Sequence, residues 1–347
     1  MPLALLDRVS PYLSRGLWIV LTYGLLLVVL NLLARLVYRR PLSLSAAAPG
    51  LSLFRAELLV PLVLTYRYVV SNFEHLQVNI AIFALALGGM YFQATRRERA
   101  GGLAIGCAAA LKVMPVVLIP YLAYRRRWRA AAWAVAATTA FSLSPALVFG
   151  WHRFVDYLGS WRAALHVGWS VGKMNQAVYA MWDRYLGHGF MPLAPPGVDD
   201  VPASGAPVVM VAWAASLAAV AALALWSFSG PRPDDHRAEL AEWGVVFLVA
   251  ALFGPVCWKA YLVVLLLANV LLVALWREPK LDQRARRIVG GTLLLSFALG
   301  GLTSDDLLGR ALAARLEMAS VITFAAVVAL AGLIYVRVRL RREPLTS

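Results

Sequence analysis

The stretch from Arg96 to Arg129, RRERAGGLAIGCAAALKVMPVVLIPYLAYRRRWR, decides the fold of this chain. It is an apolar run with arginine clusters at both ends and a single lysine, Lys112, near its middle. The positive-inside rule places both clusters in the cytoplasm. A straight transmembrane helix cannot satisfy this rule, because its two ends would face opposite compartments.

Pro115 supplies the break that the stretch needs. It removes a backbone donor and disfavours helix at Met114. We therefore expect two half-helices, each roughly 16 Å long, which is about half of the roughly 30 Å hydrocarbon core. The stretch predicts a re-entrant hairpin with Lys112 near its tip. An ammonium group at that depth indicates a functional site; the alternative is a snorkelling lysine on an ordinary helix.

The composition is that of a helical membrane protein. Hydrophobic residues make up 61% of the chain, and the mean hydropathy is +0.71. With the hairpin counted as re-entrant, the main basic clusters all fall on the cytoplasmic side, whereas a full span would place those at 277–287 and 337–342 outside. Besides the hairpin we expect about nine spans, at 17–36, 58–70, 78–93, 130–149, 208–228, 243–257, 261–276, 288–302 and 318–336.

The predicted fold class is thus an all-α polytopic membrane protein, a single integral membrane domain over residues 1–347 in the inner (plasma) membrane. The net charge of +15 comes from short clusters between apolar runs, which favours contact with membrane lipids over nucleic acid. Cys107 and Cys257 lie in apolar runs without metal-ligand spacing.

Residues 151–207 form the longest polar stretch, and we expect it to be extracytoplasmic. Its first part, WHRFVDYLGSWRAAL, places apolar residues at helical spacing, which predicts an amphipathic helix in the membrane interface. Its last part, PLAPPGVDDVPASGAP, predicts a loop. The apolar residues of the helix are Phe154, Tyr157, Leu158, Trp161 and Leu165.

Polar groups on the outer side define a candidate site. Amide side chains can hydrogen-bond a polyol, and Arg184 with Lys112 can hold phosphate oxygens. For Gln77 and Asn79 the alternative is interhelical hydrogen bonding, and for Arg184 it is contact with lipid headgroups. The Trp258-Lys259 pair with Tyr261 supplies either an interfacial anchor or a second cation for the same phosphate. The candidate substrate-binding residues are Gln77, Asn79, Lys112, Asn175, Gln176, Arg184, Lys259 and Tyr261.

Four segments resemble the glycosyltransferase family 87 polyprenyl-phosphate-sugar enzymes of GT-C type. GLAIGCAAALKVMPVVLIPYLAYRRRWRA is similar to the family's Gly-rich helix, Lys-x-x-Pro and Arg-rich exit. HLQVNIAIFALAL resembles its Gly-Gln-x-Asn segment, with Leu76 where Gly is usual. MNQAVYAMWDR resembles its Asn-Gln-Ser loop, with Ala177 for Ser, and GPVCWKAYLVVLLLA its Ser-Pro-x-x-Trp segment, with Gly254 for Ser and Tyr261 where His is often found.

The resemblance implies a GT-C-like bundle and an inverting transfer of one hexose from a polyprenyl-phosphate donor to a glycolipid or polysaccharide acceptor on the outer face. Mannose is the family's expected sugar, and no metal or other cofactor is implied. The acceptor hydroxyl then needs a carboxylate base, and the departing phosphate needs cations, for which Lys112 and Arg184 are suited.

One departure from the family concerns the catalytic base. The family carries its base Asp in the first outer loop, after a first span, and this chain begins after the positions that match both. Asp7 does not match that Asp, so we expect an upstream span and loop to be missing. Our hypothesis is that Glu74, with His75, takes the role of the base.

Two other classes of function compete with the transferase. A binding or transport protein for lipid-linked sugars that keeps the fold without catalysis would fit the absent Asp loop. A secondary transporter would fit a broken helix at the membrane midplane, but the sequence has one broken segment and no repeated halves.

Overall fold

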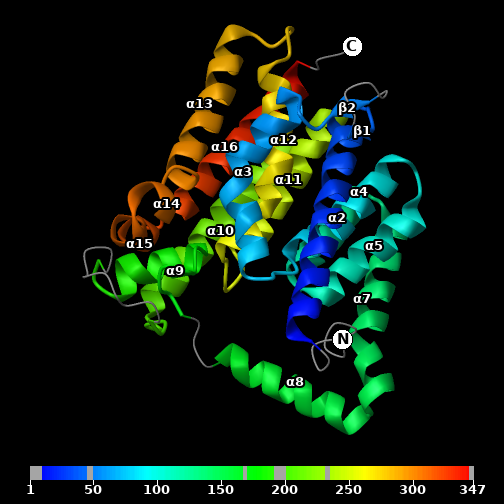
Figure 1. Ribbon diagram of the computed structural model, residues 1–347, viewed down its shortest axis with the longest axis vertical. Helices are drawn as coiled ribbons and strands as arrows, with labels where there is room; N and C mark the ends of the chain where they lie inside the picture. The colour runs from blue at the N-terminus through cyan, green and yellow to red at the C-terminus, as the bar shows by residue number, and fades with distance from the viewer. Residues whose placement is uncertain (1–9, 45–49, 167–169, 191–200, 231–234, 344–347) are drawn as a thin grey trace.

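The computed structural model describes residues 10–44, 50–166, 170–190, 201–230 and 235–343. Long helices lie side by side in a bundle, and short helices gather at the end opposite to the C-terminus (Figure 1). In the described residues the only sheet is a parallel pair of two-residue strands, β1 (Leu42–Ser43) and β2 (Leu51–Ser52). The all-α fold class is confirmed.

The bundle consists of ten long helices among the described residues. These are α2 (Pro11–Val37), α3 (Ala56–Glu74), α4 (Asn79–Ala94), α5 (Glu98–Leu111), α7 (Trp128–Phe149), α10 (Pro207–Phe228), α11 (His236–Leu252), α12 (Leu265–Trp276), α13 (Gln283–Gly300) and α16 (Val321–Arg342). The other elements are η1 (Met114–Val117), α6 (Leu118–Tyr124), α8 (Trp151–His166), α9 (Val178–Trp182), η2 (Asp183–Gly187), η4 (Lys259–Val264), α14 (Asp305–Leu308) and α15 (Arg310–Met318).

Five helices of the described chain are long and apolar enough to cross a membrane: α2, α7, α10, η4 with α12, and α16. In the most apolar 18-residue segments of α7 and α10, only 11% and 6% of the residues are buried. Such apolar surface left outside the bundle is what lipid contact requires. The structure therefore supports a multi-pass membrane protein, while the count of nine spans stays a prediction.

Three helices begin earlier than the hydrophobic pattern predicts, because polar residues cap them. Helix α2 starts at Pro11, where the side chain of Ser10 accepts a hydrogen bond from the Leu13 N–H. Asp235 caps α11 and Asp282 caps α13 in the same way. Capping satisfies backbone donors that the helix itself leaves unpaired, so a helix can extend beyond its apolar segment.

The stretch around Lys112 has the shape of the expected hairpin. Helix α5 ends at Leu111, Lys112 is extended with φ −154° and ψ 131°, and the chain continues through η1 and α6. Gly102 packs on Ala130 and Gly106 on Ala134, so α5 and α7 run in the same direction. The chain must therefore return through η1 and α6 before α7 begins, which brings both ends of the stretch to one end of the bundle.

Buried ion pairs fasten the return limb of the hairpin to α11 and α16. Arg125 binds Glu242, which also accepts hydrogen bonds from the Tyr121 hydroxyl at 2.8 Å and from Arg337 Nε at 2.6 Å. Arg127 pairs with Glu239. The arginine cluster after the hairpin is thus partly a buried structural element.

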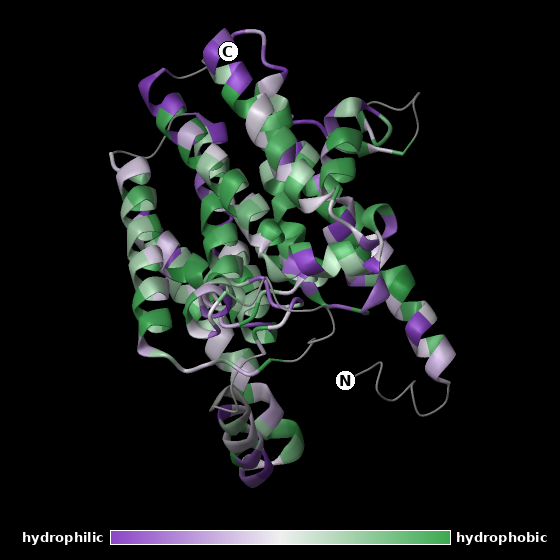
Figure 2. Ribbon diagram, turned by 90° about the vertical axis from the view of Figure 1, so that its left-hand side faces the viewer, coloured by the Kyte–Doolittle hydropathy of each residue, from purple (hydrophilic) through white to green (hydrophobic). Residues whose placement is uncertain are grey.

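The other basic clusters meet at the same end of the bundle. Hydrophilic residues gather there around the C-terminus, whereas hydrophobic residues dominate the middle of the long helices (Figure 2). This gathering agrees with the positive-inside pattern expected for a re-entrant hairpin. The contacts that join these clusters are Arg39 with His236, Arg237 with Glu278, Arg277 with Glu57, Arg339 with Asp282 and Arg341 with Ser229.

The predicted amphipathic helix is present as α8 and lies at the opposite end of the molecule (Figure 1). Phe154 is buried, while Tyr157, Leu158 and Trp161 are exposed. Its position in a membrane interface stays a prediction. Of the predicted loop at 192–207, residues 192–200 lie outside the described residues, as does Asp7. Helices α14 and α15 were not expected, because the segment at 304–317 carries no long apolar run.

We predict that Gly106→Ala lowers the melting temperature of the purified protein by several degrees. A Cβ atom at Gly106 would lie 2.5 Å from the Ala134 carbonyl oxygen, so α5 and α7 would have to move apart. The matched control is Gly24→Ala in α2, where no atom lies within 4 Å. There the better helix propensity of alanine, up to about 1 kcal/mol, should leave stability unchanged or higher. Equal melting temperatures for the two variants would contradict the close packing.

Candidate functional site

Lys112 lies at the centre of a polar cluster at the end of the bundle opposite to the basic clusters. Its Nζ atom lies 2.5 Å from Asn79 Oδ1 at the start of α4, and 3.2 Å from the ring centroid of Tyr261 in η4. Because the ammonium group turns inward to these two partners, the snorkelling alternative does not fit the structure. The structure brings together three of the residues expected from the sequence.

Asn72, which the sequence analysis missed, positions Asn79. Its side-chain oxygen accepts a hydrogen bond of 3.2 Å from Asn79 Nδ2. Its own Nδ2 donates to the carbonyl oxygens of Tyr68 at 2.8 Å and Ala260 at 2.9 Å. Asn72 therefore ties α3, α4 and η4 together beneath Lys112. The sequence did hold a signal for this role, because Asn72 is a polar residue near the end of an apolar helix, seven residues before Asn79.

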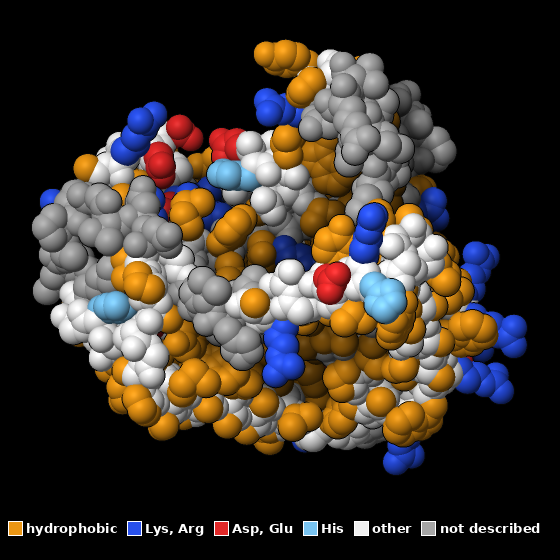
Figure 3. Space-filling view, turned by 90° about the horizontal axis from the view of Figure 1, so that it is seen from below, with side chains coloured by type: hydrophobic (Ala, Val, Ile, Leu, Met, Phe, Trp, Pro, Cys, Tyr) orange, Lys and Arg blue, Asp and Glu red, His pale blue; other side chains and the backbone are white. Residues whose placement is uncertain are grey.

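The surroundings of Lys112 are apolar and accessible. Leu111 and Val113, its neighbours in the chain, are 61% and 62% exposed. Figure 3, which looks at this end of the molecule, shows a hollow lined mostly by hydrophobic side chains, with basic side chains deep inside it. A cation next to exposed apolar surface suits a ligand that has both an anionic group and a hydrocarbon part.

A second charged cluster at this end is organised by Glu317, another residue that the sequence analysis missed. Its Oε1 atom lies 2.5 Å from Arg67 Nη2 and 2.8 Å from Lys259 Nζ. Glu317 and Arg67 are buried. One buried carboxylate therefore holds two cations, Arg67 and Lys259, next to Ala260 and Tyr261. No local motif could have revealed this, since Glu317 lies 250 residues after Arg67.

The amide side chains of Asn175 and Gln176 are occupied by the protein itself. Asn175 Nδ2 donates to Ser170 and Pro255 carbonyls, and its Oδ1 accepts from the Ala177 and Cys257 N–H groups. Gln176 Nε2 donates to the carbonyl of Glu317 at 2.9 Å, and its Oε1 accepts from Thr323. In this arrangement both amides fix the conformation of the loop at 170–177, which precedes α9. Contact of these amides with a sugar stays a prediction.

Arg184 is fully buried and holds the same loop from beneath. Its Nη1 donates to the carbonyl oxygens of Val171, Gly172 and Asn175 at 2.8–3.1 Å, and its Nη2 donates to Ser320 Oγ at 2.7 Å. This burial does not fit the lipid-headgroup alternative. Contact with a substrate phosphate would require these bonds to be released, so the observed geometry gives Arg184 a structural role.

Glu74, His75 and Gln77 lie where α3 turns into α4. Glu74 and His75 are exposed. His75 Nδ1 lies 3.1 Å from the Ser71 carbonyl oxygen, which can only accept a hydrogen bond. In the neutral ring this contact places the proton on Nδ1, which leaves Nε2 as an acceptor. Gln77 makes a long contact of 3.4 Å with the His75 carbonyl oxygen. These residues precede Asn79 by two to five positions, and their roles stay predictions.

Together, the apolar helical bundle and the lysine at a broken hairpin define a helical membrane protein with a candidate anion site. Residues 1–257 match glycosyltransferase family 87. The chain belongs to this family, as the four resembling segments predict. No solved structure matches the chain significantly.

Curated relatives of the chain are mycobacterial enzymes. It is 30% identical over 236 residues to the polyprenol-phosphate-mannose-dependent alpha-(1-2)-phosphatidylinositol pentamannoside mannosyltransferase of Mycobacterium tuberculosis (strain CDC 1551 / Oshkosh), covering 65% of this chain and 47% of that enzyme. It is 28% identical over 214 residues to the polyprenol-phosphate-mannose-dependent alpha-(1-2)-phosphatidylinositol mannoside mannosyltransferase of Mycolicibacterium smegmatis (strain ATCC 700084 / mc(2)155), covering 59% and 43%. The matches span about half the length of these relatives.

We predict that Glu317→Gln destabilises the protein by about 3 kcal/mol, because it leaves two cations without their buried carboxylate. Asp305→Asn is the matched control, since Asp305 is 55% exposed and lies 3.9 Å from the same Arg67. That control should cost less than about 1 kcal/mol. Thermal unfolding of the two variants in one detergent measures the difference, and similar losses would show that Glu317 does not organise this cluster.

Proposed function

We propose that this chain is a membrane mannosyltransferase that transfers mannose from a polyprenyl-phosphate donor to a glycolipid acceptor. Membership of family 87 and the donors named for the relatives support this reaction. The acceptors named for those relatives are phosphatidylinositol mannosides, so a mannosylated lipid is the acceptor class that we propose here.

The observation that carries the proposal is the environment of Lys112. A polyprenyl-phosphate sugar is an anion attached to a long hydrocarbon chain. Lys112 offers a cation, and Leu111 and Val113 offer exposed apolar surface on both sides of it. A site for a soluble nucleotide sugar would have no use for this apolar surface. A site for an apolar ligand would leave the ammonium group without an anion.

The proposed chemistry is a single displacement with inversion. The acceptor hydroxyl oxygen attacks the anomeric carbon of mannose, and the bond from that carbon to the phosphate oxygen breaks. Polyprenyl phosphate leaves with the electron pair, and Lys112 stabilises the negative charge that develops on it. We propose that Glu74, or Nε2 of His75, is the general base that accepts the proton of the attacking hydroxyl.

The remaining candidate residues support this arrangement. Asn79 and Tyr261 orient the ammonium group, and we assign Lys259, which Glu317 holds, as a second cation for the same phosphate. Asn175, Gln176 and Arg184 shape the neighbouring loop. In the membrane we place the Lys112 end on the outer face and the basic end in the cytoplasm, with a GT-C-like bundle of about nine spans and α8 in the outer interface of the inner membrane.

We predict that Lys112→Gln lowers kcat for mannose transfer by about 100-fold or more, because it removes one donor that stabilises the leaving phosphate. The control is Lys280→Gln, which removes a lysine at the opposite end of the bundle and should leave kcat unchanged. Transfer of radiolabelled mannose from polyprenyl-phosphate-mannose by purified protein is the measurement. An unchanged kcat for Lys112→Gln would exclude the proposed role.

We predict that Glu74→Gln lowers kcat by about 100-fold or more while donor affinity stays within twofold, since a lost general base removes that order of rate enhancement. His75→Ala tests the alternative base, and Glu98→Gln at the opposite end is the control. Full activity in both Glu74→Gln and His75→Ala would remove both from the mechanism. Donor binding without turnover in the unsubstituted protein would favour the sugar-lipid binding protein instead.

A further inference from the structure

A cavity of about 300 Å³ lies at the end of the bundle opposite to Lys112, between the end of α2, the end of α4 and the start of α11. It is separate from the proposed transfer site, because α2 and α4 run through the whole bundle between the two ends (Figure 1). The residues that line it are Arg35, Leu36, Arg39, Tyr91, Ala94, Thr95, His236, Glu239, Leu240 and Trp243.

The rim of this cavity carries positive charge that the described residues do not neutralise. Arg35 contacts Asn31 Oδ1, and Arg39 contacts His236 Nδ1 at 3.1 Å, but among the described residues neither arginine has a carboxylate within 4 Å. The only acidic residue in the lining is Glu239, and Arg127 already holds it.

The contact between Arg39 and His236 does not provide a counter-ion. A guanidinium group can only donate hydrogen bonds, so His236 Nδ1 must accept and its ring must be neutral. Burial, together with the charge of Arg39, lowers the pKa of His236 and keeps it in this form. Asp235 Oδ1 lies 3.7 Å from the same nitrogen, but it caps α11 by accepting from the Arg237 N–H. Among the described residues the contact with His236 is the one side-chain contact that Arg39 makes, so most of its five N–H donors are left for another partner.

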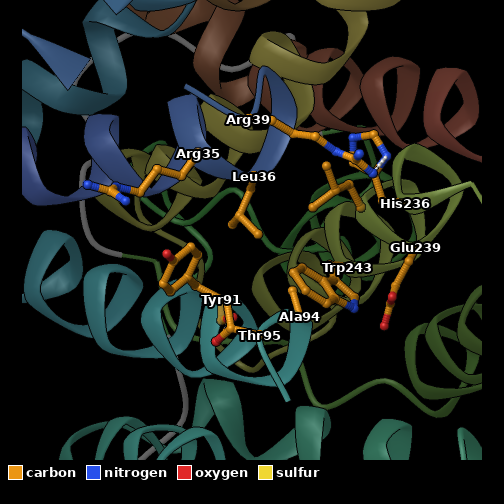
Figure 4. A pocket seen from close by; sticks show the side chains of 10 residues that line it. Arg35, Leu36, Arg39, Tyr91, Ala94, Thr95, His236, Glu239 and Trp243 are labelled. Atoms are coloured by element: carbon orange, nitrogen blue, oxygen red, sulfur yellow. Dashed lines mark hydrogen bonds between the residues drawn. The ribbon is translucent and has the colours of Figure 1, made fainter. Parts of the chain in front are cut away.

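The inside of the cavity is apolar and aromatic. Figure 4 shows Leu36 between the two arginines, with Arg39 reaching His236 on one side and Arg35 extending outward on the other. Tyr91, Ala94 and Trp243 form the opposite wall. Apolar walls beneath a cationic rim suit an amphiphile better than a small hydrophilic anion.

We propose that this cavity binds the phosphate headgroup of an anionic lipid, with Arg39 as the main phosphate ligand and the apolar wall against the glycerol and first acyl carbons. Basic pockets between helices on the cytoplasmic side of a membrane take such headgroups. The guanidinium fork matches phosphate oxygens in geometry and charge. This site does not depend on the transferase activity, because it lies at the other end of the bundle.

Native mass spectrometry of the purified full-length chain tests the proposal, with phosphatidylglycerol and phosphatidylcholine added in equal amounts. We expect one retained phosphatidylglycerol with at least about fivefold preference, and loss of that preference in Arg39→Gln. The matched control is Arg126→Gln, because Arg126 is an exposed arginine at the same end with the same left-handed backbone, φ 57° against 56°, and does not line the cavity. Ala94→Leu fills the cavity without changing charge and should also reduce retention.

Competition with inorganic phosphate shows whether the ligand of the cavity is a lipid headgroup or a free phosphate ion. If phosphate at millimolar concentration binds with the same dependence on Arg39 and displaces the lipid, the site takes a free phosphate ligand. If it does not displace the lipid, the headgroup is the ligand. Equal losses in Arg39→Gln and Arg126→Gln, or no preference for the anionic lipid, would overturn the site and show only general attraction to the basic end.

Discussion

The structure depends on the pairing of charges inside an apolar bundle, and Glu242 is the strongest case. An unpaired charge in such surroundings costs several kcal/mol or more, so a buried carboxylate must be matched by cations and hydrogen-bond donors. Glu242 has no exposed surface and binds Arg125, Arg337 and the Tyr121 hydroxyl. These partners come from α6 and α16, so one carboxylate on α11 fixes the return limb of the hairpin. Without that return, Lys112 would not lie at the tip of a hairpin.

Glu317 applies the same constraint at the other end of the bundle. It joins Arg67 of α3 to Lys259 of η4, while its carbonyl oxygen accepts from Gln176. Segments that are far apart in the chain are thereby held against η4, which carries the Tyr261 ring under Lys112. Two buried carboxylates thus set the geometry of the candidate site from opposite ends of the bundle.

Local chemistry explains which features could be predicted. The break at Lys112 was predictable, because a proline and two flanking basic clusters are local signals. The early starts of α2, α11 and α13 were missed, because capping by Ser10, Asp235 and Asp282 acts outside the apolar pattern. Lys112, Asn79 and Tyr261 could be named from residue type and family resemblance. The role of Glu317 could not, because its partners become neighbours only in the folded bundle.

Two cations at the end of the bundle opposite to the basic clusters, Lys112 and Arg184, show why a residue type does not define a role. The two Nη atoms of Arg184 are bound to three carbonyl oxygens and a hydroxyl, and its side chain is fully buried. An ammonium group has three N–H donors. One N–H donor of Lys112 is directed to Asn79, and the Tyr261 ring faces the ammonium group. The described contacts therefore leave N–H donors of Lys112 for a ligand. Of these two residues, Lys112 is therefore the one that can take up a phosphate oxygen without breaking the fold.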